Sequence, residues 1–185
     1  MRVIAGRLGG RRLKAPRGRT TRPTSDRVRE ALFAMLGDVE RARVLDLFAG
    51  TGALGIEALS RGARRAVFVE RDGAAVTALS ANLAALNIGP DVAEVRRAEA
   101  LAALRSARGA KETYDLLFID PPYAWAARPE SERWGRELTT LLAPLLEPGA
   151  RIVVESDRRA PLALGVEVER QKRYGDTSIT IHRQQ

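Results

Sequence analysis

From Arg43 to the carboxyl terminus, short apolar segments alternate with longer segments that have helical periodicity. A nearly continuous apolar run of about four to eight residues is typical of a strand that is buried on both faces. Strands that alternate with helices in this way form a parallel sheet with helices on both sides. The alternation therefore predicts an α/β fold.

The predicted strands are residues 43–47, 66–69, 92–96, 114–119 and 151–155, followed by an antiparallel pair at 166–172 and 178–181. Predicted helices occupy residues 53–60, 73–86, 100–108 and 132–146. Another helix precedes the first strand, because Ser25 or Thr24 can cap its beginning and Gly37 can end it. We therefore expect a mostly parallel seven-stranded sheet with an antiparallel C-terminal strand.

Positive charge is concentrated at the amino terminus. The chain of 185 residues has 31 basic and 23 acidic residues, a net charge of +8. Residues 1–29 hold ten basic residues and one acid, which leaves the remainder of the chain at −1. This confinement favours a polyanionic partner, because neutralising phosphates releases counterions. The alternative is a solvated, arginine-rich tail.

The basic segment is predicted to form an arm of residues 1–23, and residues 24–185 a single larger domain. Gly9 and Gly10 separate two short runs that can pair as a β-hairpin, and residues 16–23 form an extended linker. The chain lacks cysteine and any apolar run long enough for a membrane span, which fits a cytoplasmic protein. Its one histidine, His182, is expected on a surface strand.

A glycine-rich loop follows the first predicted strand. Gly50, Gly52 and Gly55 match the G-x-G-x-x-G pattern, which lets a ligand approach the backbone. Asp46 would repel a pyrophosphate and attract an ammonium group, and Glu70 can accept hydrogen bonds from both ribose hydroxyls. These two acids favour S-adenosylmethionine over NAD.

The fourth predicted strand ends in Asp120-Pro121-Pro122-Tyr123. The Asp120 carboxylate and the Pro121 carbonyl can accept both N–H groups of an exocyclic amine, and proline adds no competing donor. Tyr123 can stack on a planar ring. The tetrapeptide therefore favours a site that holds a heterocycle by its amine, the alternative being an ordinary turn after a buried strand.

Residues 22–33, 44–55, 68–70 and 120–123 together resemble the bacterial 16S rRNA guanine-N2 methyltransferase family, and the similarity continues to residues 172–177. The resemblance implies a Rossmann-like S-adenosylmethionine-dependent methyltransferase fold that methylates the N2 amine of a guanine in small-subunit ribosomal RNA. Glu99 departs from the family, where an aspartate is expected. Its contact with the adenine of the cofactor could pass to the Ala100 backbone N–H, and Glu99 could instead be an exposed helix cap.

The expected site residues form three groups. The cofactor contacts are Asp46, Phe48, Ala49, Gly50, Thr51, Gly52, Glu70, Arg71, Glu99 and Ala100. The catalytic group is Asp120, Pro121, Pro122 and Tyr123. The residues expected to bind RNA phosphates are Arg7, Arg11, Arg12, Lys14, Arg22, Arg27 and Arg29. We expect a monomer with no metal ion and no membrane partner.

Three other functions remain open at this point. An adenine-N6 DNA methyltransferase would use the same Asp-Pro-Pro-Tyr segment on a different exocyclic amine. A nucleotide-dependent oxidoreductase would use the glycine loop, although Asp46 and the Asp-Pro-Pro-Tyr turn speak against it. A non-catalytic RNA-binding or ribosome-assembly factor would need neither.

Overall fold

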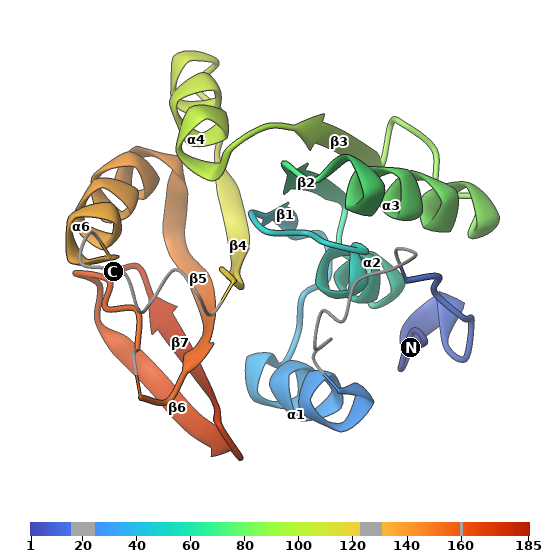
Figure 1. Cartoon of the computed structure of the whole chain (residues 1–185), viewed down its shortest axis with the longest axis horizontal. Coiled ribbons are helices and arrows are strands. Elements are labelled where there is room, and N and C mark those ends of the chain that lie inside the picture. Colours follow the sequence, from blue (N-terminus) through green and yellow to red (C-terminus); the bar gives the residue numbers. More distant parts are fainter. Residues whose placement is uncertain (16–24, 123–130, 160) are drawn as a thin grey trace.

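A computed structural model describes residues 1–15, 25–122, 131–159 and 161–185. Within these residues a seven-stranded sheet has the order β3-β2-β1-β4-β5-β7-β6 (Figure 1). Its strands are β1 (Arg43–Asp46), β2 (Arg65–Glu70), β3 (Ala93–Arg97), β4 (Tyr114–Ile119), β5 (Leu146–Asp157), β6 (Val168–Tyr174) and β7 (Thr177–Arg183). The five strands from β3 to β5 pair in parallel, and β7 pairs antiparallel with both β5 and β6. The predicted fold class is confirmed.

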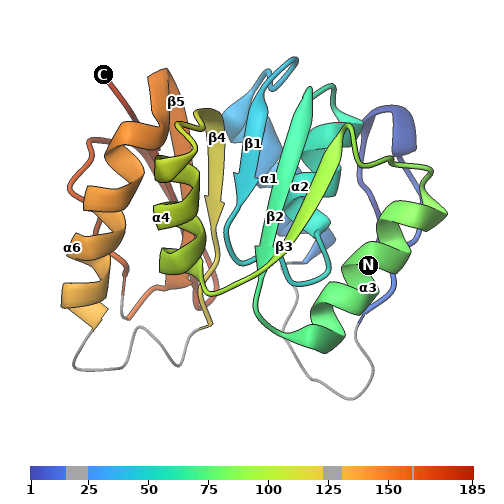
Figure 2. The same ribbon diagram turned by 90° about the horizontal axis from the view of Figure 1, so that it is seen from above.

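Helices cover both faces of the sheet, so each face has its own apolar core. The helices are α1 (Asp26–Leu36), α2 (Ala53–Ser60), α3 (Gly73–Ala85), α4 (Ala100–Gly109) and α6 (Ser131–Leu142). One core contains side chains of α1, α2 and α3, and the other contains side chains of α4 and α6. Figure 2 shows α4 and α6 together on one side of the sheet and α1 and α2 behind it.

Local signals in the sequence account for most helix boundaries. Ser25 caps α1 by accepting a hydrogen bond from the Val28 N–H, and Asp72 caps α3 in the same way. The predicted helix at 132–146 is shorter in the structure. It becomes a 3-10 turn at Ala143–Leu145, and β5 begins at Leu146. Pro144 explains the change, because proline inside an α-helix removes a hydrogen bond and clashes with the preceding turn.

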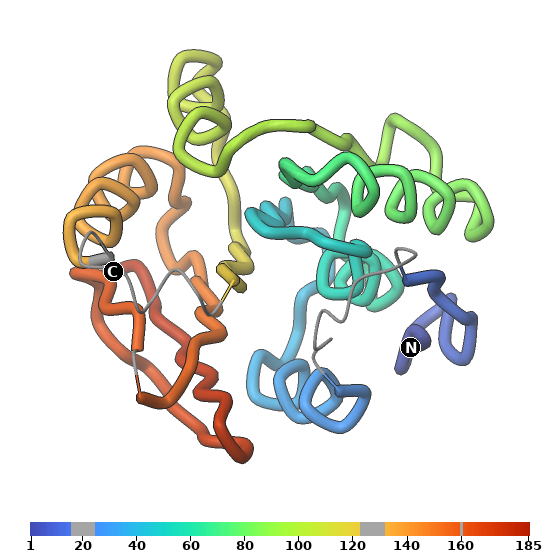
Figure 3. The backbone as a smooth tube through the Cα atoms, in the orientation of Figure 1, coloured from blue at the N-terminus to red at the C-terminus, as the bar shows by residue number. Residues whose placement is uncertain are grey.

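The amino-terminal arm folds back on itself and packs against the domain. Arg2 and Arg12 form one antiparallel bridge, and the turn between them includes a 3-10 helix, Gly6–Leu8. The arm is thus a hairpin with a single bridge, and Val3 and Leu13 join the core on the α2 side. Figure 3 shows this segment beside α2, on the side of the fold away from β6.

His182 corrects one expectation, because it is buried and only 3% exposed. Its strand β7 lies between β5 and β6 and not at the edge of the sheet, so both of its neighbours shield it. The Nδ1 atom lies 2.9 Å from the Val166 carbonyl oxygen. Across the described parts of the chain, no helix combines the length and apolarity needed to cross a bilayer.

Candidate functional site at the carboxyl ends of the strands

The acidic residues singled out in the sequence gather at one edge of the sheet. Asp46 is the last residue of β1, Glu70 is the last residue of β2, and Asp120 directly follows β4. These strands are parallel, so their carboxyl ends meet at the same edge. The strand order reverses between β1 and β4, and such a switch point opens a crevice where α/β proteins bind ligands.

The glycine loop after β1 leaves its backbone accessible at Gly50. Gly50 has a φ of 53°, and a Cβ built on it would find nothing within 4 Å. Gly52 differs, because its Cβ would lie 2.3 Å from the Leu79 side chain and its φ is 81°. Gly52 is therefore needed for packing, and Gly50 leaves open space in which a ligand could contact the loop.

Glu70 holds this loop in place. Its carboxylate accepts the Gly50 N–H at 2.9 Å and the Asp72 N–H at 2.8 Å. Each carboxylate oxygen has a second lone pair, so Glu70 can still accept a hydrogen bond from a ligand hydroxyl. The side chain thus organises the glycine loop from the end of the neighbouring strand.

Asp46 is buried beneath the loop and is 2% exposed. Its Oδ2 accepts the Gly55 N–H at 3.0 Å, which ties β1 to the first turn of α2. Burial raises the pKa of Asp46 from 3.8 to about 7, the Gly55 hydrogen bond lowers it in part, and the nearby Glu70 charge adds to the rise. An ammonium group beside Asp46 would oppose this shift and favour the carboxylate.

Asp120 also has an abnormal pKa. Burial raises it well above 3.8, and the charges of Glu155 and Asp46 raise it further. The residue keeps some surface exposure, Pro121 beside it is buried, and Pro122 is exposed. Tyr123 lies outside the described residues. A carboxyl group whose pKa is raised in this way is a better proton acceptor when it is ionised.

The sequence analysis missed Glu155. It lies near the end of β5 and is 6% exposed, and its charge raises the pKa of Asp120. The signal was present in the sequence, because Glu155 is the last residue of the predicted strand that follows Asp120. The parallel pairing of β4 and β5 was needed to place the two side by side. Among the described residues, no group of three or more histidine or acidic side chains is arranged to hold a metal ion.

The other predicted cofactor residues surround the loop at different depths. Phe48 is partly buried and its ring lies 5.9 Å from that of Trp134, while Ala49 is buried. Thr51 offers its carbonyl to the Asn82 side chain. Arg71 and Glu99 pair at 3.3 Å with about half of each side chain exposed.

Glu99 is the N-cap residue of α4, and its side chain makes no capping hydrogen bond. Ala100, the first residue of that helix, is buried. Glu99 is therefore an exposed residue at the start of a helix, which is the alternative that the sequence left open. Its contact with a cofactor stays a prediction.

Most of the predicted phosphate-binding side chains are exposed. Arg7, Arg11, Arg12, Lys14 and Arg27 lie on the surface, and Arg22 falls outside the described residues. Arg29 is a correction, because it is only 1% exposed. It pairs with Asp26 at 2.9 Å and donates to the Arg2 carbonyl, so it fastens the arm to α1 and is not available to RNA.

Side chains of α2 and α3 bind the arm through its backbone. The fully buried Glu57 accepts the Ile4 and Ala5 N–H groups at 2.7 and 3.0 Å, and it pairs with Arg61. Asn82 accepts the Lys14 N–H at 2.8 Å and donates to the carbonyls of Lys14 and Thr51, each at 3.1 Å. One buried amide therefore contacts both the arm and the glycine loop.

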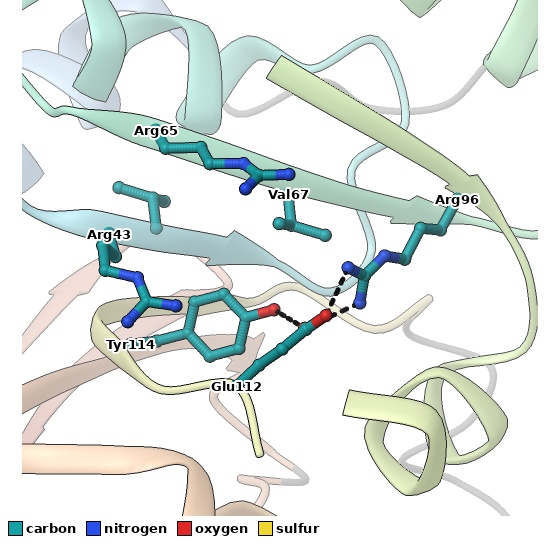
Figure 4. A pocket seen from close by; sticks show the side chains of 7 residues that line it. Arg43, Arg65, Val67, Arg96, Glu112 and Tyr114 are labelled. Atoms are coloured by element: carbon teal, nitrogen blue, oxygen red, sulfur yellow. Dashed lines mark hydrogen bonds and ion pairs between the residues drawn. The ribbon is translucent and has the colours of Figure 1, made fainter. Parts of the chain in front are cut away.

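A pocket at the opposite edge of the sheet contains several arginines. Arg43, Arg65 and Arg96 line it together with Val44, Val67, Glu112 and Tyr114 (Figure 4). Arg96 forms a bidentate pair with Glu112 at 2.7 and 2.8 Å, and the Tyr114 hydroxyl donates to Glu112. Arg65 pairs with Glu94. These ion pairs compensate the positive charge, so the site at the carboxyl ends of the strands is the stronger candidate.

Comparisons with known proteins identify the family of this chain. The sequence profile of a family described as "Conserved hypothetical protein 95" matches residues 1–183. A Bacillus subtilis protein named "Putative rRNA methyltransferase YlbH" is 40% identical over 189 residues, which covers 99% of this chain and 98% of that protein.

Two further matches cover most of the chain. The "Ribosomal RNA small subunit methyltransferase D" of Haemophilus influenzae is 35% identical over 165 residues, or 88% of this chain and 81% of that protein. The solved structure of a hypothetical protein from Thermus thermophilus is 32% identical and has a TM-score of 0.80 over 98% of each chain.

Proposed function

The chain belongs to the Conserved hypothetical protein 95 family, and from this premise we propose that it is a methyltransferase that uses S-adenosylmethionine to methylate a guanine N2 amine in small-subunit ribosomal RNA. The names of its relatives support an rRNA methyltransferase. The choice of guanine N2 comes from the resemblance of four sequence segments to the bacterial 16S rRNA guanine-N2 methyltransferase family. The geometry of the site accounts for how such a reaction would proceed.

The residues around the glycine loop fit this cofactor. The open space at Gly50 allows a ligand to approach the loop, and Glu70 can accept from ribose hydroxyls while it holds the Gly50 N–H. Asp46 offers a carboxylate to an amino group. S-adenosylmethionine, when bound, supplies a methyl group on a positively charged sulfur. A cofactor without phosphates is favoured here, because the carboxylate of Asp46, buried beneath the loop, would repel a pyrophosphate.

Asp120 and Pro121 hold the amine that is methylated. Guanine N2 is a poor nucleophile, because its lone pair is delocalised into the ring. Hydrogen bonds from both of its N–H groups to the Asp120 carboxylate and the Pro121 carbonyl favour a more pyramidal nitrogen with its lone pair directed at the donor carbon. The protein thus contributes alignment and electrostatic complementarity to the charge that develops on nitrogen.

Asp120 also accepts the proton that N2 loses once the new N–C bond has formed. Its raised pKa makes the carboxylate more basic than an exposed aspartate. The guanine must be unpaired or leave its stack to reach this buried edge. Tyr123, which follows the two prolines, supplies the stacking surface in this proposal.

The exposed arm residues bind RNA phosphates beside the site. Arg7, Arg11, Arg12 and Lys14 are all on the surface of a segment that is fastened to α2 and α3. A rigidly attached cationic surface loses less entropy on binding than a free tail. Recognition would then rest on RNA shape and unstacked bases.

One observation carries this proposal. The accessible glycine loop and the Asp120-Pro121 acceptors lie at the ends of the paired strands β1 and β4. A methyl donor bound to the loop and an amine held by the acceptors would therefore be neighbours. A structural or assembly protein would have no use for this arrangement.

The test is to incubate the protein with radiolabelled S-adenosylmethionine and unmodified small ribosomal subunits, and then to digest the RNA to nucleosides. We expect label in N2-methylguanosine with the wild-type chain and none above background with Asp120→Ala. Label in N6-methyladenosine, or on DNA and not on RNA, would identify the adenine methyltransferase instead. Full labelling by Asp120→Ala would contradict the assigned role of Asp120.

A further inference from the structure

Asp120 and Glu155 lie on the same face of the sheet. In the β4–β5 register Phe118 pairs with Val153 and Ile119 pairs with Val154, so the next pair is Asp120 with Glu155. Phe118 and Val153 belong to the core on the α1 side, and Ile119 and Val154 belong to the other core. Because side chains alternate along a strand, both carboxyl groups point to the α1 side.

Glu155 lies on the side of Asp120 away from the cofactor loop. The strand order is β1-β4-β5, so β4 separates Glu155 from the glycine loop after β1. Neighbouring strands are about 4.8 Å apart, and two such side chains can contact adjacent atoms of one base. A purine whose amine is held by Asp120 would therefore extend toward Glu155.

The two carboxyl groups also interact electrostatically. The charge of Glu155 is the largest cause, after burial, of the raised pKa of Asp120. Glu155 is 6% exposed, so a substrate that reaches it meets a buried hydrogen-bond acceptor with little water around it. A carboxylate has about four acceptor positions, so Glu155 can bind a base N–H in addition to a partner in the protein.

The atom next to the amine differs among purines. In guanine, N1 beside the N2 amine carries a hydrogen and is a donor. In 2-aminopurine the same N2 amine lies beside an N1 that has no hydrogen and is an acceptor. In adenine, N1 next to the N6 amine is likewise an acceptor. A carboxylate at this position would accept the N1–H of guanine and would repel the N1 lone pair of the other two bases. A buried acceptor discriminates strongly against a ligand that offers no N–H to it.

We propose that the Glu155 carboxylate accepts the N1–H of the target guanine, next to the amine held by Asp120, and that Glu155 thereby makes the site select guanine. The inference rests on the proposed function and deepens it. It assigns the choice between guanine and adenine to a single residue of β5. The Asp-Pro-Pro-Tyr segment alone holds either amine.

The experiment compares guanine with 2-aminopurine at the nucleotide that the wild-type chain methylates, in ribosomal RNA ligated from synthetic and transcribed pieces. Both bases carry the N2 amine. We expect wild type to methylate guanine with at least tenfold higher kcat/KM than 2-aminopurine, since losing a buried hydrogen bond costs about this much or more. Glu155→Gln should lose about tenfold on guanine and gain on 2-aminopurine, because its amide N–H can donate to N1.

Glu169→Gln is the matched control, because it makes the same change at an exposed residue of β6. It should keep the wild-type ratio of the two substrates. 2-Aminopurine also lacks O6, and this loss affects every variant alike. The test is therefore how the ratio of kcat/KM on guanine to kcat/KM on 2-aminopurine differs between variant and wild type. An unchanged ratio in Glu155→Gln would overturn the inference.

Glu155→Ala gives a second measurement, because alanine neither accepts nor donates. It should lose guanine methylation and leave the rate on 2-aminopurine within about threefold of wild type. Thermal unfolding and calorimetry with S-adenosylmethionine establish that each variant is folded and binds the cofactor. If wild type methylates no guanine, the proposed function fails. If wild type methylates guanine and every variant keeps the wild-type ratio of guanine to 2-aminopurine methylation, only the role of Glu155 fails.

Discussion

At the scale of single residues, the site depends on carboxyl groups that the fold buries fully or in part. Asp46 and Asp120 both have raised pKa values, chiefly because of burial. Glu70 instead has its carboxylate hydrogen bonded to two backbone N–H groups. Asp46, whose pKa is about 7, is therefore sensitive to pH near neutrality, and this sensitivity can be measured.

The first prediction concerns the pH dependence of stability at Asp46. Its pKa is about 7 in the folded protein against 3.8 in a free aspartate. Between these two values the unfolded chain has released the proton and the folded chain keeps it, so stability falls as pH rises through this window and levels off above it. The slope is roughly 1.4 kcal/mol per pH unit at most.

Asp46→Asn should remove this contribution, because asparagine cannot ionise and can still accept the Gly55 N–H. Urea unfolding at several pH values between 4 and 7.5 measures it. As pH rises, the unfolding free energy of wild type should fall relative to that of the variant. Two parallel curves would contradict the raised pKa of Asp46.

The second prediction concerns Gly50. Alanine there costs about 1 kcal/mol of strain, since φ is positive, and it also fills the open space of the loop. We expect Gly50→Ala to weaken S-adenosylmethionine binding at least tenfold by calorimetry. Gly37→Ala is the control, because Gly37 has a φ of 71° and equally open surroundings at the end of α1. Its ψ of −138° lies outside the left-handed helical region, so alanine there should cost at least as much stability, and cofactor affinity should stay unchanged.

At the scale of elements, the arm belongs to the folded domain. Val3 and Leu13 are buried, and Glu57 has its charge satisfied by arm N–H groups. Deleting the arm would expose apolar surface and leave a buried carboxylate without these donors, which is strongly destabilising. Point substitutions therefore test its function better than truncation does.

The third prediction concerns Asn82, which contacts both the arm and the glycine loop. Asn82→Ala removes three hydrogen bonds, so we expect a loss of about 1–3 kcal/mol in stability. Amide exchange at residues 1–14 should become faster, and S-adenosylmethionine affinity should fall. Ser80→Ala, on an exposed position of the same helix, should change neither. Faster exchange with unchanged cofactor affinity would show that the arm and the loop are independent.

At the scale of the whole molecule, charge is distributed unevenly. The net charge of +8 comes from residues 1–29, while the remainder is close to neutral. The exposed cations of the arm lie beside α2 and α3, whose preceding loops form the proposed cofactor site. Long-range attraction would therefore bring RNA to the half of the molecule that contains the proposed cofactor site.

The fourth prediction tests this distribution. Replacing Arg7, Arg11, Arg12 and Lys14 with glutamine should weaken binding to small-subunit RNA and reduce the slope of log K against log salt by about one unit for each phosphate that is no longer neutralised. Cofactor affinity should stay the same. The control replaces four exposed cations outside the arm with glutamine, which changes the net charge by the same amount. These cations are Arg64, Arg105, Arg108 and Lys111. Equal effects of the two sets would mean that only total charge matters.

Much of this protein follows from local sequence. Strand β4 and helix α2 begin and end at the predicted residues, and Ser25, one of the two expected caps, caps α1. These features depend on residues a few positions apart, such as a periodic apolar pattern, a cap or a glycine. The positions of Asp46, Glu70 and Asp120 at one edge then follow from parallel pairing.

What the sequence determined by itself is the order of the elements and the acids at the strand ends. Only the tertiary structure decided that Arg29 and His182 are buried and that Glu155 lies beside Asp120. The reason is physical. Burial and adjacency depend on which distant segments pack together, and the strand order and the docked arm bring together residues that are far apart along the chain.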